Sequence, residues 1–244
     1  MHKTVQDILN MKKEKKKISV ITSYDYTLAS LCDNSGIDVL LVGDSAGMVM
    51  LGYENTIPVT MDQMCMFTEA VSRARKNSLL VSDLPFMSYQ ASIEDAINNS
   101  GRLIKAGADA VKLEGGNSII KIVEHLIKNK VQVMGHLGVL PQSVKGKFKF
   151  KGKKQIERKK IFNDAKLLES KGVFSLVLEC VETSLAKQIT KSLKIPTIGI
   201  GSSVYCDGQV LVTDDLLGLN EAKIKFVKKF GNIKKYIKIS AQKF

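Results

Sequence analysis

Cysteine and histidine are scarce in this chain of 244 residues, and long hydrophobic runs are absent from it. The four cysteines (Cys32, Cys65, Cys180 and Cys206) are scattered and form no Cys-x-x-Cys pair, which argues against a disulfide framework or a structural zinc site. No apolar run approaches the ~20 residues that span a membrane. The charged segment 1–17 is not followed by the apolar stretch of a secretory signal. We therefore expect a cytoplasmic protein with reduced thiols and no membrane partner.

The formal net charge of +13 is the feature that would suggest a nucleic-acid partner. The charge is concentrated in two segments. Residues 145–160 hold nine basic residues and one acid, and the tail 221–244 holds eight lysines and one acid, so the rest of the chain is close to neutral. Lysine is the dominant base, whereas arginine is the better residue for bidentate phosphate recognition. We therefore interpret both segments as solvated surface and expect no nucleic-acid partner.

Short runs of apolar and β-branched residues recur along the chain and predict eight strands. The runs are continuous rather than alternating, which is typical of parallel strands that are covered on both faces. They cover residues 18–24, 38–44, 79–83, 110–115, 131–138, 175–180, 196–201 and 209–215.

Amphipathic stretches between these runs predict helices over 60–77, 92–108, 117–129 and 163–172. Ser92, with acidic residues behind it, is a suitable helix start, and Gly107 and Gly172 are suitable helix ends. The lysine-rich segment 145–160 is expected to be a loop.

Strand and helix alternate about eight times in ~240 residues, which predicts an α/β fold of the (β/α)₈ TIM-barrel type. An open doubly wound sheet is the alternative. It requires a glycine-rich dinucleotide turn after the first strand, and "TSYDYTLA" (22–29) contains no glycine. We expect one barrel domain over 1–244, with an N-terminal extension at 1–17 and a basic helical tail at 221–244.

Ionisable and hydroxyl-bearing side chains stand where the expected strands end. In a barrel these ends converge on one mouth, where barrel enzymes keep their active sites. The residues are Tyr24 and Asp25, Asp44 with Ser45, Asp83, Lys112 with Glu114, His136, and Glu179.

Each of these residues taken alone has a structural explanation. A single aspartate after a strand is commonly a helix cap, His136 alone suits a hydrogen-bonded core position, and Cys180 suits a small buried hydrophobe. The four carboxylates Asp44, Asp83, Glu114 and Glu179 would repel one another at one mouth, however, so a cation is expected among them. Oxygen ligands with open positions suit Mg²⁺, and a single histidine at a strand end argues against zinc.

Long blocks of the sequence resemble the ketopantoate hydroxymethyltransferase family. The blocks occur in order between about residue 3 and about residue 219. They are "VITSYDYTLA", "LLVGDSAGMVMLGYENTIPVTMDQM", "LLVSDLPFMSY", "AGADAVKLEGG", "GHLGVLPQSV", "LVLECV" and "IPTIGIGS". The resemblance implies a Mg²⁺-dependent barrel of the phosphoenolpyruvate/pyruvate type that assembles as a homo-oligomer, commonly a decamer. It also implies transfer of a hydroxymethyl group from 5,10-methylenetetrahydrofolate to 3-methyl-2-oxobutanoate, giving 2-dehydropantoate for pantothenate biosynthesis.

The resemblance also implies roles for the residues at the strand ends. Asp44 and Asp83 match the metal-binding aspartates, which also contact substrate, and Glu114 matches the acidic residue near the metal. Ser45 and Lys112 match residues that hold the substrate, and Glu179 matches the proton acceptor. His136 and Tyr24 are expected to support the site.

Two other functions remain open on sequence alone. A Mg²⁺-dependent carbon–carbon lyase acting on a 2-oxo acid would share the barrel and the metal. Such lyases usually carry a reactive cysteine in a lysine–cysteine–glycine–histidine run, which this chain lacks. A non-catalytic RNA-associated protein is suggested only by charge.

Overall fold

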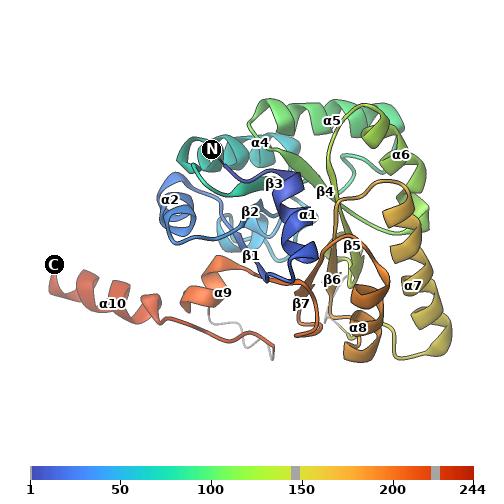
Figure 1. Cartoon of the computed structure of the whole chain (residues 1–244). Coiled ribbons are helices and arrows are strands. Elements are labelled where there is room, and N and C mark those ends of the chain that lie inside the picture. The colour runs from blue at the N-terminus through green and yellow to red at the C-terminus, as the bar shows by residue number, and fades with distance from the viewer. Residues whose placement is uncertain (1, 144–148, 221–225) are drawn as a thin grey trace.

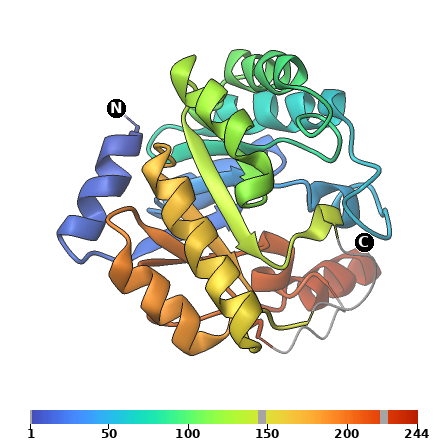
Figure 2. The same cartoon turned by 90° about the vertical axis from the view of Figure 1, so that its right-hand side faces the viewer.

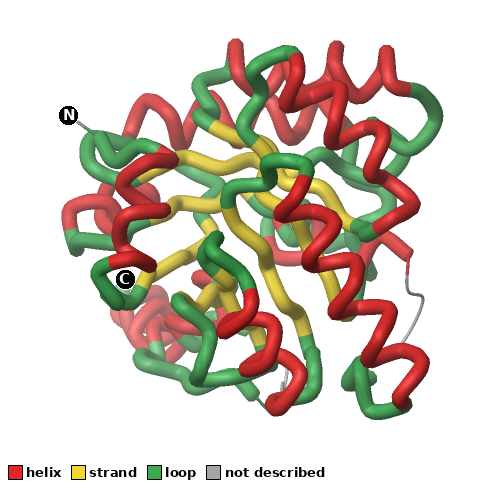
Figure 3. Tube along the Cα trace, turned by 45° about the vertical axis from the view of Figure 1, so that its right-hand side comes forward, coloured by secondary structure: helices red, strands yellow, loops and turns green. Residues whose placement is uncertain are grey.

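Eight parallel strands close into a barrel in a computed structural model of the chain, which describes residues 2–143, 149–220 and 226–244. The strands are β1 (Ile18–Thr22), β2 (Val39–Val42), β3 (Leu79–Asp83), β4 (Ala110–Glu114), β5 (Val133–Gly138), β6 (Ser175–Glu179), β7 (Thr197–Ile200) and β8 (Gly208–Leu211). Each strand pairs in parallel with the next, and β8 pairs with β1. The helices surround the strands (Figures 1 and 3). The predicted barrel is confirmed, and each of the eight predicted runs overlaps a strand. The last run, 209–215, is a strand only as far as Leu211, because a helix begins at Thr213.

Helices follow the strands along the chain, and one more helix precedes β1. They are α1 (Val5–Lys13), α2 (Tyr26–Asn34), α3 (Ala46–Val49), α4 (Met61–Ala74), α5 (Ile93–Lys105), α6 (Ile120–Lys128), α7 (Gln155–Ser170), α8 (Thr183–Ser192), α9 (Thr213–Leu217) and α10 (Ile233–Lys243), with 3₁₀ turns η1 (Asn117–Ile119) and η2 (Pro141–Ser143). The predicted start of α5 and the predicted C-terminal ends of α5 and α7 are confirmed, whereas α7 begins at Gln155 rather than at residue 163. The Ser92 hydroxyl accepts from the backbone of Asp95, and Gly107 and Gly172 take positive φ angles of 106° and 94° just after the two helices.

The expectation of a loop over residues 145–160 is wrong for its second half. Helix α7 begins at Gln155, so the basic residues from Arg158 to Lys160 lie on its first turns. Lysine, arginine, glutamate and glutamine are good helix formers at solvated positions, and Glu157 suits the positive N-terminal end of a helix. Residues 144–148 lie outside the described part of the chain.

Two hydrophobic cores arise because successive side chains of a strand point to opposite faces. On β2, Val39 and Leu41 point into the barrel, whereas Leu40 and Val42 pack against the helices. Ile8 of α1 is fully buried and belongs to the inner core. Helix α1 therefore covers the end of the barrel at which the strands begin (Figure 2), which leaves the opposite end for the cavity described below.

Helix α10 contrasts with the other helices, because none of its residues is buried. It extends away from the barrel in Figure 1. Within the described ranges, no helix is both long enough and apolar enough to cross a bilayer.

Candidate active site

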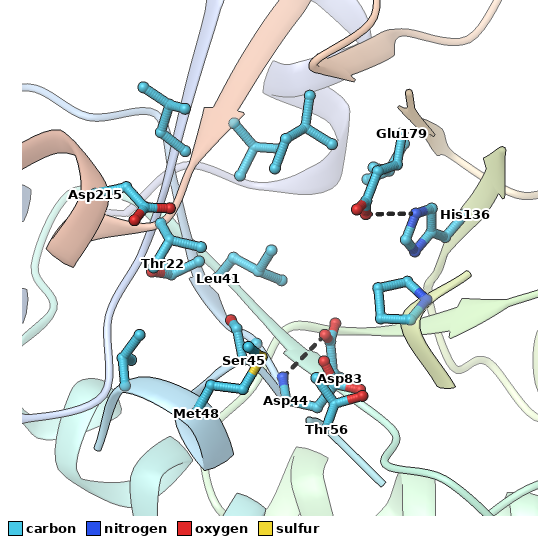
Figure 4. A pocket seen from close by; sticks show the side chains of 18 of the residues that line it. Thr22, Leu41, Asp44, Ser45, Met48, Thr56, Asp83, His136, Glu179 and Asp215 are labelled. Carbon is cyan, nitrogen blue, oxygen red and sulfur yellow. Dashed lines mark hydrogen bonds and ion pairs between the residues drawn. The ribbon is translucent and has the colours of Figure 1, made fainter. Parts of the chain in front are cut away.

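A cavity of about 310 Å³ lies at the C-terminal ends of the barrel strands. Its ionisable and hydroxyl-bearing lining includes Asp44, Ser45, Asp83, Lys112, Glu114, His136 and Glu179. Apolar walls come from β2, β6, β7 and β8, through Leu41, Val177, Ile200 and Val210. Figure 4 shows Glu179 and His136 on one side of the cavity and Asp44, Ser45 and Asp83 on another. The strand ends thus bring together the residues that the sequence singled out, except for Tyr24 and Asp25, which do not line the cavity.

The turn after β2 brings Asp44 against Asp83. The backbone N–H of Asp44 donates to Asp83 Oδ2 at 3.1 Å. Gly43 precedes this contact, and a Cβ atom there would lie 2.8 Å from Ser45 Oγ and 3.7 Å from Asp83 Oδ2. The missing side chain at Gly43 therefore gives the turn room beside the carboxylate of β3.

Lys112 supplies a positive charge to this pair of aspartates. Its Nζ lies 2.9 Å from Asp83 Oδ1, and both side chains are buried. Burial and the neighbouring charges of Asp83 and Glu114 raise the pKa of Asp44 to about 8. Burial also raises the pKa of Asp83, although Lys112 opposes that shift. Asp44 is therefore hard to ionise, although the nearby Lys112 favours its charged form.

Ser45 is held from behind by a buried tyrosine at the end of β1. The Tyr24 hydroxyl lies 2.7 Å from Ser45 Oγ, and burial raises the pKa of Tyr24. Ser45 stands at the N-terminal boundary of α3, where its side chain caps no backbone N–H of the helix. Its hydroxyl is therefore free of helix capping and lines the cavity.

His136 on β5 joins two carboxylates from neighbouring strands. Its Nδ1 lies 3.4 Å from Glu114 Oε1, and its Nε2 lies 3.2 Å from Glu179 Oε2. Burial lowers the pKa of His136, but the two glutamates have the larger combined effect and raise this pKa to about 9. At neutral pH the ring is an imidazolium, so Glu179 has a charged partner on the side away from Asp44.

The backbone around Glu179 is tightly fixed. Val139 N–H donates to Glu179 O at 2.9 Å, and a Cβ at Gly138 would lie only 2.1 Å from that oxygen. Cys180 follows with a φ angle of +49°, which non-glycine residues seldom adopt, and its N–H donates to Ile200 O at 2.9 Å. These contacts from β5 and β7 fix the direction in which the Glu179 side chain leaves its strand.

Gln142 and Tyr89, which the sequence analysis missed, form hydrogen bonds that connect the acidic residues of the site. Gln142 in η2 donates from Nε2 to Asp44 Oδ2 at 2.9 Å and from its backbone N–H to Glu114 Oε2 at 3.1 Å. Tyr89, which is buried, lies with its hydroxyl 3.0 Å from Gln142 Oε1. Both residues lie in the connections between strands and α-helices rather than at strand ends. Their positions depend on the paths of the loops that follow β3 and β5, and patterns of strand residues do not predict those paths.

Asp215 in α9 is a further cavity residue without an assigned role in the sequence analysis. It belongs to the run that predicted the last strand, and its Oδ1 accepts from Asn220 Nδ2 at 3.0 Å. Phe226 and Val227 also line the cavity, and the Phe226 ring packs against Gly201. The chain after α9 therefore forms part of the cavity wall.

Two buried carboxylates of this kind fit a hard divalent cation. Mg²⁺ prefers oxygen ligands and is usually held by one or two carboxylates, with water or substrate oxygens completing its shell. Among the described residues, no three side chains of histidine, cysteine, aspartate or glutamate are grouped as a metal site. Both oxygens of Glu114 already face His136 and Gln142. Both oxygens of Asp83 also have partners, Lys112 Nζ on Oδ1 and the Asp44 N–H on Oδ2. Asp44, Asp83 and Glu114 as ligands of a cation therefore all stay predictions.

Comparisons with known proteins place the whole described chain in one family. The model of the family described as ketopantoate hydroxymethyltransferase matches residues 2–244. A 3-methyl-2-oxobutanoate hydroxymethyltransferase of Nitrosopumilus maritimus is 64% identical over 236 residues, covering 96% of this chain and 85% of that protein. The enzyme of the same name from Pelagibacter ubique is 53% identical over 245 residues, covering 100% and 94%.

Solved structures with a similar fold are distant in sequence. A 2,3-dimethylmalate lyase, described as a member of the PEP mutase/isocitrate lyase superfamily, matches with a TM-score of 0.68 at 10% identity, covering 98% of this chain and 85% of the other. A phosphonopyruvate hydrolase in complex with oxalate and Mg²⁺ matches with a TM-score of 0.63 at 11% identity, covering 99% and 85%. At such identities the likeness concerns the fold alone, and it confirms the predicted (β/α)₈ barrel fold.

Proposed function

The chain belongs to the ketopantoate hydroxymethyltransferase family, and we propose that it transfers a hydroxymethyl group from 5,10-methylenetetrahydrofolate to 3-methyl-2-oxobutanoate. The product would be 2-dehydropantoate, a precursor of pantothenate. One observation carries the proposal for this chain: Asp44, Asp83 and Lys112 share one cavity with Glu179. A cation site, a fixed positive charge and a base are the groups that the enolisation of a 2-oxo acid requires.

Asp44 and Asp83 would hold Mg²⁺, with Glu114 beside them. The bound ion would act as a Lewis acid that polarises the carbonyl of the 2-oxo acid. The high pKa of Asp44 supports this assignment, because a carboxylate that is hard to ionise among other carboxylates is stabilised by a cation.

Lys112 and Ser45 would hold the carboxylate of the substrate. The Lys112 ammonium is buried, and the surrounding carboxylates raise its pKa, so it stays charged throughout the physiological range. The Ser45 hydroxyl lines the cavity and can donate one hydrogen bond. The apolar side chains of Val177, Ile200 and Val210 offer a matching wall for the branched carbon chain of 3-methyl-2-oxobutanoate.

Glu179 would accept the proton from C3 of the 2-oxo acid. The electron pair of the broken C–H bond would then form the bond to the methylene carbon of the folate, while the bond from that carbon to one folate nitrogen breaks. Water would displace the second folate nitrogen and supply the oxygen of the hydroxymethyl group. The two nitrogens would take up the proton from C3 and one proton from water, so that tetrahydrofolate leaves. Because His136 pairs with Glu179 Oε2, the base is held toward the cavity before substrate arrives.

A turnover assay with 3-methyl-2-oxobutanoate, 5,10-methylenetetrahydrofolate and Mg²⁺ tests the proposal. We expect 2-dehydropantoate from the wild type and none from Asp83→Asn, which keeps the size of the side chain but removes a negative charge. Calorimetry with MgCl₂ should show sharply weaker binding to Asp83→Asn. Unchanged Mg²⁺ affinity in this variant would rule out the metal assignment.

The lyase alternative has less support in the cavity. Among the described lining residues there is no cysteine. Burial and the nearby Glu179 raise the pKa of Cys180 to about 11, so this thiol is not a ready nucleophile. Cleavage of a 2-oxo acid in the absence of folate would favour the lyase.

The homo-oligomer, and the decamer in particular, stays a prediction of the resemblance. Sedimentation of the full chain tests it directly, since a decamer has ten times the mass of the 26.9 kDa chain.

A further inference from the structure

Gln142 is a buried amide whose four hydrogen-bonding positions all face partners. Its Nε2 donates to Asp44 Oδ2 and to Leu84 O, each at 2.9 Å. Its Oε1 lies 3.0 Å from the Tyr89 hydroxyl and accepts from Gln90 Nε2 at 3.2 Å. The side chain is only 2% exposed. A buried amide with every position satisfied is held in one orientation, because the reverse orientation would place its oxygen against two acceptors.

This orientation matters because of what it does to Asp44. The amide N–H stabilises negative charge on Oδ2 of a carboxylate that Asp83 and Glu114 crowd with charge of the same sign. An amide is neutral, so it favours the ionised carboxylate without adding a positive charge that would repel a cation. Among the described residues, none donates a hydrogen bond to the other oxygen, Oδ1, which remains available to a ligand.

The backbone of Gln142 links the same loop to a second carboxylate. Its N–H donates to Glu114 Oε2, while the Tyr89 hydroxyl accepts from the backbone N–H of Glu114. The turn η2 therefore fixes the ends of β2 and β4 relative to each other. Neither Gln142 nor Tyr89 lines the cavity, so both act from behind it.

We propose that Gln142 is a positioning residue that sets the affinity of the site for Mg²⁺, by holding Asp44 Oδ2 so that the other oxygen faces the ion. This inference rests on the proposed function, because it requires Asp44 to bind the cation. It assigns Gln142 no contact with substrate.

Calorimetric titration of the full chain with MgCl₂, without substrate, tests the inference. Gln142→Met keeps the length of the side chain and removes both the amide nitrogen and the amide oxygen. We expect its Mg²⁺ affinity to fall by about 10- to 100-fold, the usual effect of losing a partner that orients a metal ligand. Gln142→Asn keeps an amide but withdraws it by one methylene, and it should show a loss in the same direction if Gln142→Met does not fold.

Gln90→Met is the matched control. It removes a donor to the far end of the same amide, leaves the bond to Asp44, and replaces an exposed side chain. The Mg²⁺ affinity of Gln90→Met should stay within about twofold of the wild type. If Gln142 only packs the loop, Gln142→Met and Gln90→Met should both change the thermal midpoint of unfolding, and neither should change Mg²⁺ affinity.

The titrations separate two kinds of failure. A folded Gln142 variant that binds Mg²⁺ as tightly as the wild type would overturn the inference and leave the proposed function intact. If the wild type binds no Mg²⁺, or if Asp83→Asn binds Mg²⁺ as tightly as the wild type, the metal assignment is overturned, and the inference is overturned with it.

Discussion

His136 Nε2 lies 3.2 Å from Glu179 Oε2, and both side chains are buried at the end of neighbouring strands. The other ring nitrogen faces Glu114, so the imidazolium sits between a residue beside the proposed cation site and the proposed base. In the proposed mechanism, this arrangement separates the side of the cavity that would bind the oxygens of the substrate from the side that would take its proton.

The role of Glu179 can be measured without folate, because enolisation alone exchanges the C3 hydrogen with solvent. We expect the wild type with Mg²⁺ to incorporate deuterium into 3-methyl-2-oxobutanoate in D₂O. Glu179→Gln should lose exchange and turnover by about 10²–10⁴-fold, the usual contribution of a general base, and still bind Mg²⁺. Exchange at the wild-type rate in this variant would mean that another group is the base, and His136 would be tested next.

The raised pKa of His136 predicts a characteristic pH dependence of stability. The folded-state pKa of about 9 exceeds the ordinary value of 6.5, so the folded chain binds the proton more tightly than the unfolded chain. The stabilisation by the ring is therefore complete below about pH 6.5 and is lost as the pH rises through about 9. Denaturant unfolding of the wild type and His136→Gln should show this, as a difference in free energy that is constant at low pH and shrinks between these values. A difference that does not change with pH would contradict the ion pairs.

Mg²⁺ binding is expected to release a proton at neutral pH. The pKa of Asp44 is about 8 without the ion, so much of this carboxyl is protonated at pH 7 and must ionise to bind a cation. Mg²⁺ affinity should rise by up to about tenfold per pH unit below pH 8 and level off above it. Calorimetry at pH 7 in two buffers of different ionisation enthalpy measures the released proton directly. Identical apparent enthalpies in the two buffers would count against the assignment.

Tyr24→Phe should affect substrate binding through Ser45. The substitution removes only the hydroxyl that lies 2.7 Å from Ser45 Oγ and keeps the ring packed against Phe67. Loss of one hydrogen bond costs about 1 kcal/mol, so KM for the 2-oxo acid should rise about fivefold with little change in kcat. Ser45→Ala should raise KM at least as much. If Tyr24→Phe lowers kcat and leaves KM unchanged, the tyrosine acts on the chemistry rather than on binding.

The lysines before α7 are expected to attract anionic substrates. Lys151 N–H donates to Cys180 O at 2.8 Å, which anchors this basic segment next to the strand that carries Glu179. Replacing Lys149, Lys151, Lys153 and Lys154 by glutamine should lower kcat/KM at low salt through lost electrostatic steering. The effect should vanish at high salt, where surface charges are screened. An effect that is independent of salt would point to direct contact instead.

The barrel and most of the site follow from patterns that are local in the sequence. Each buried strand is a short apolar run, and a polar residue at its end is placed at the mouth by the topology alone, as for Asp44 and Glu179. Asp25 shows the limit of this reasoning. It also follows a strand, but its side chain accepts from Leu28 N–H and caps α2, as a residue after a strand commonly does.

The connections between site residues were not predictable in this way. Gln142 reaches Asp44 across 98 positions of sequence, and its place depends on the path of the loop after β5. The start of α7 was missed for a related reason. Its first residues carry few apolar side chains, so the helical periodicity of apolar residues is weak there. The helix forms in this part because its solvated residues have high intrinsic helix propensity.

The closure of the barrel has a consequence for the order of events during synthesis. β1 pairs with β8, and Thr213 N–H donates to Thr22 Oγ1 from 191 positions further along the chain. The ionisable residues from Asp44 to Glu179 are synthesised before β8, so they are made while the first strand still lacks its final neighbour. Until β8 emerges, β1 and β7 present open strand edges that invite pairing with other nascent chains. A ribosome that stalls just before codon 208 would therefore hold a chain in which the ionisable residues from Asp44 to Glu179 are translated, whereas Val210, Asp215 and Phe226, which complete the cavity wall, are not.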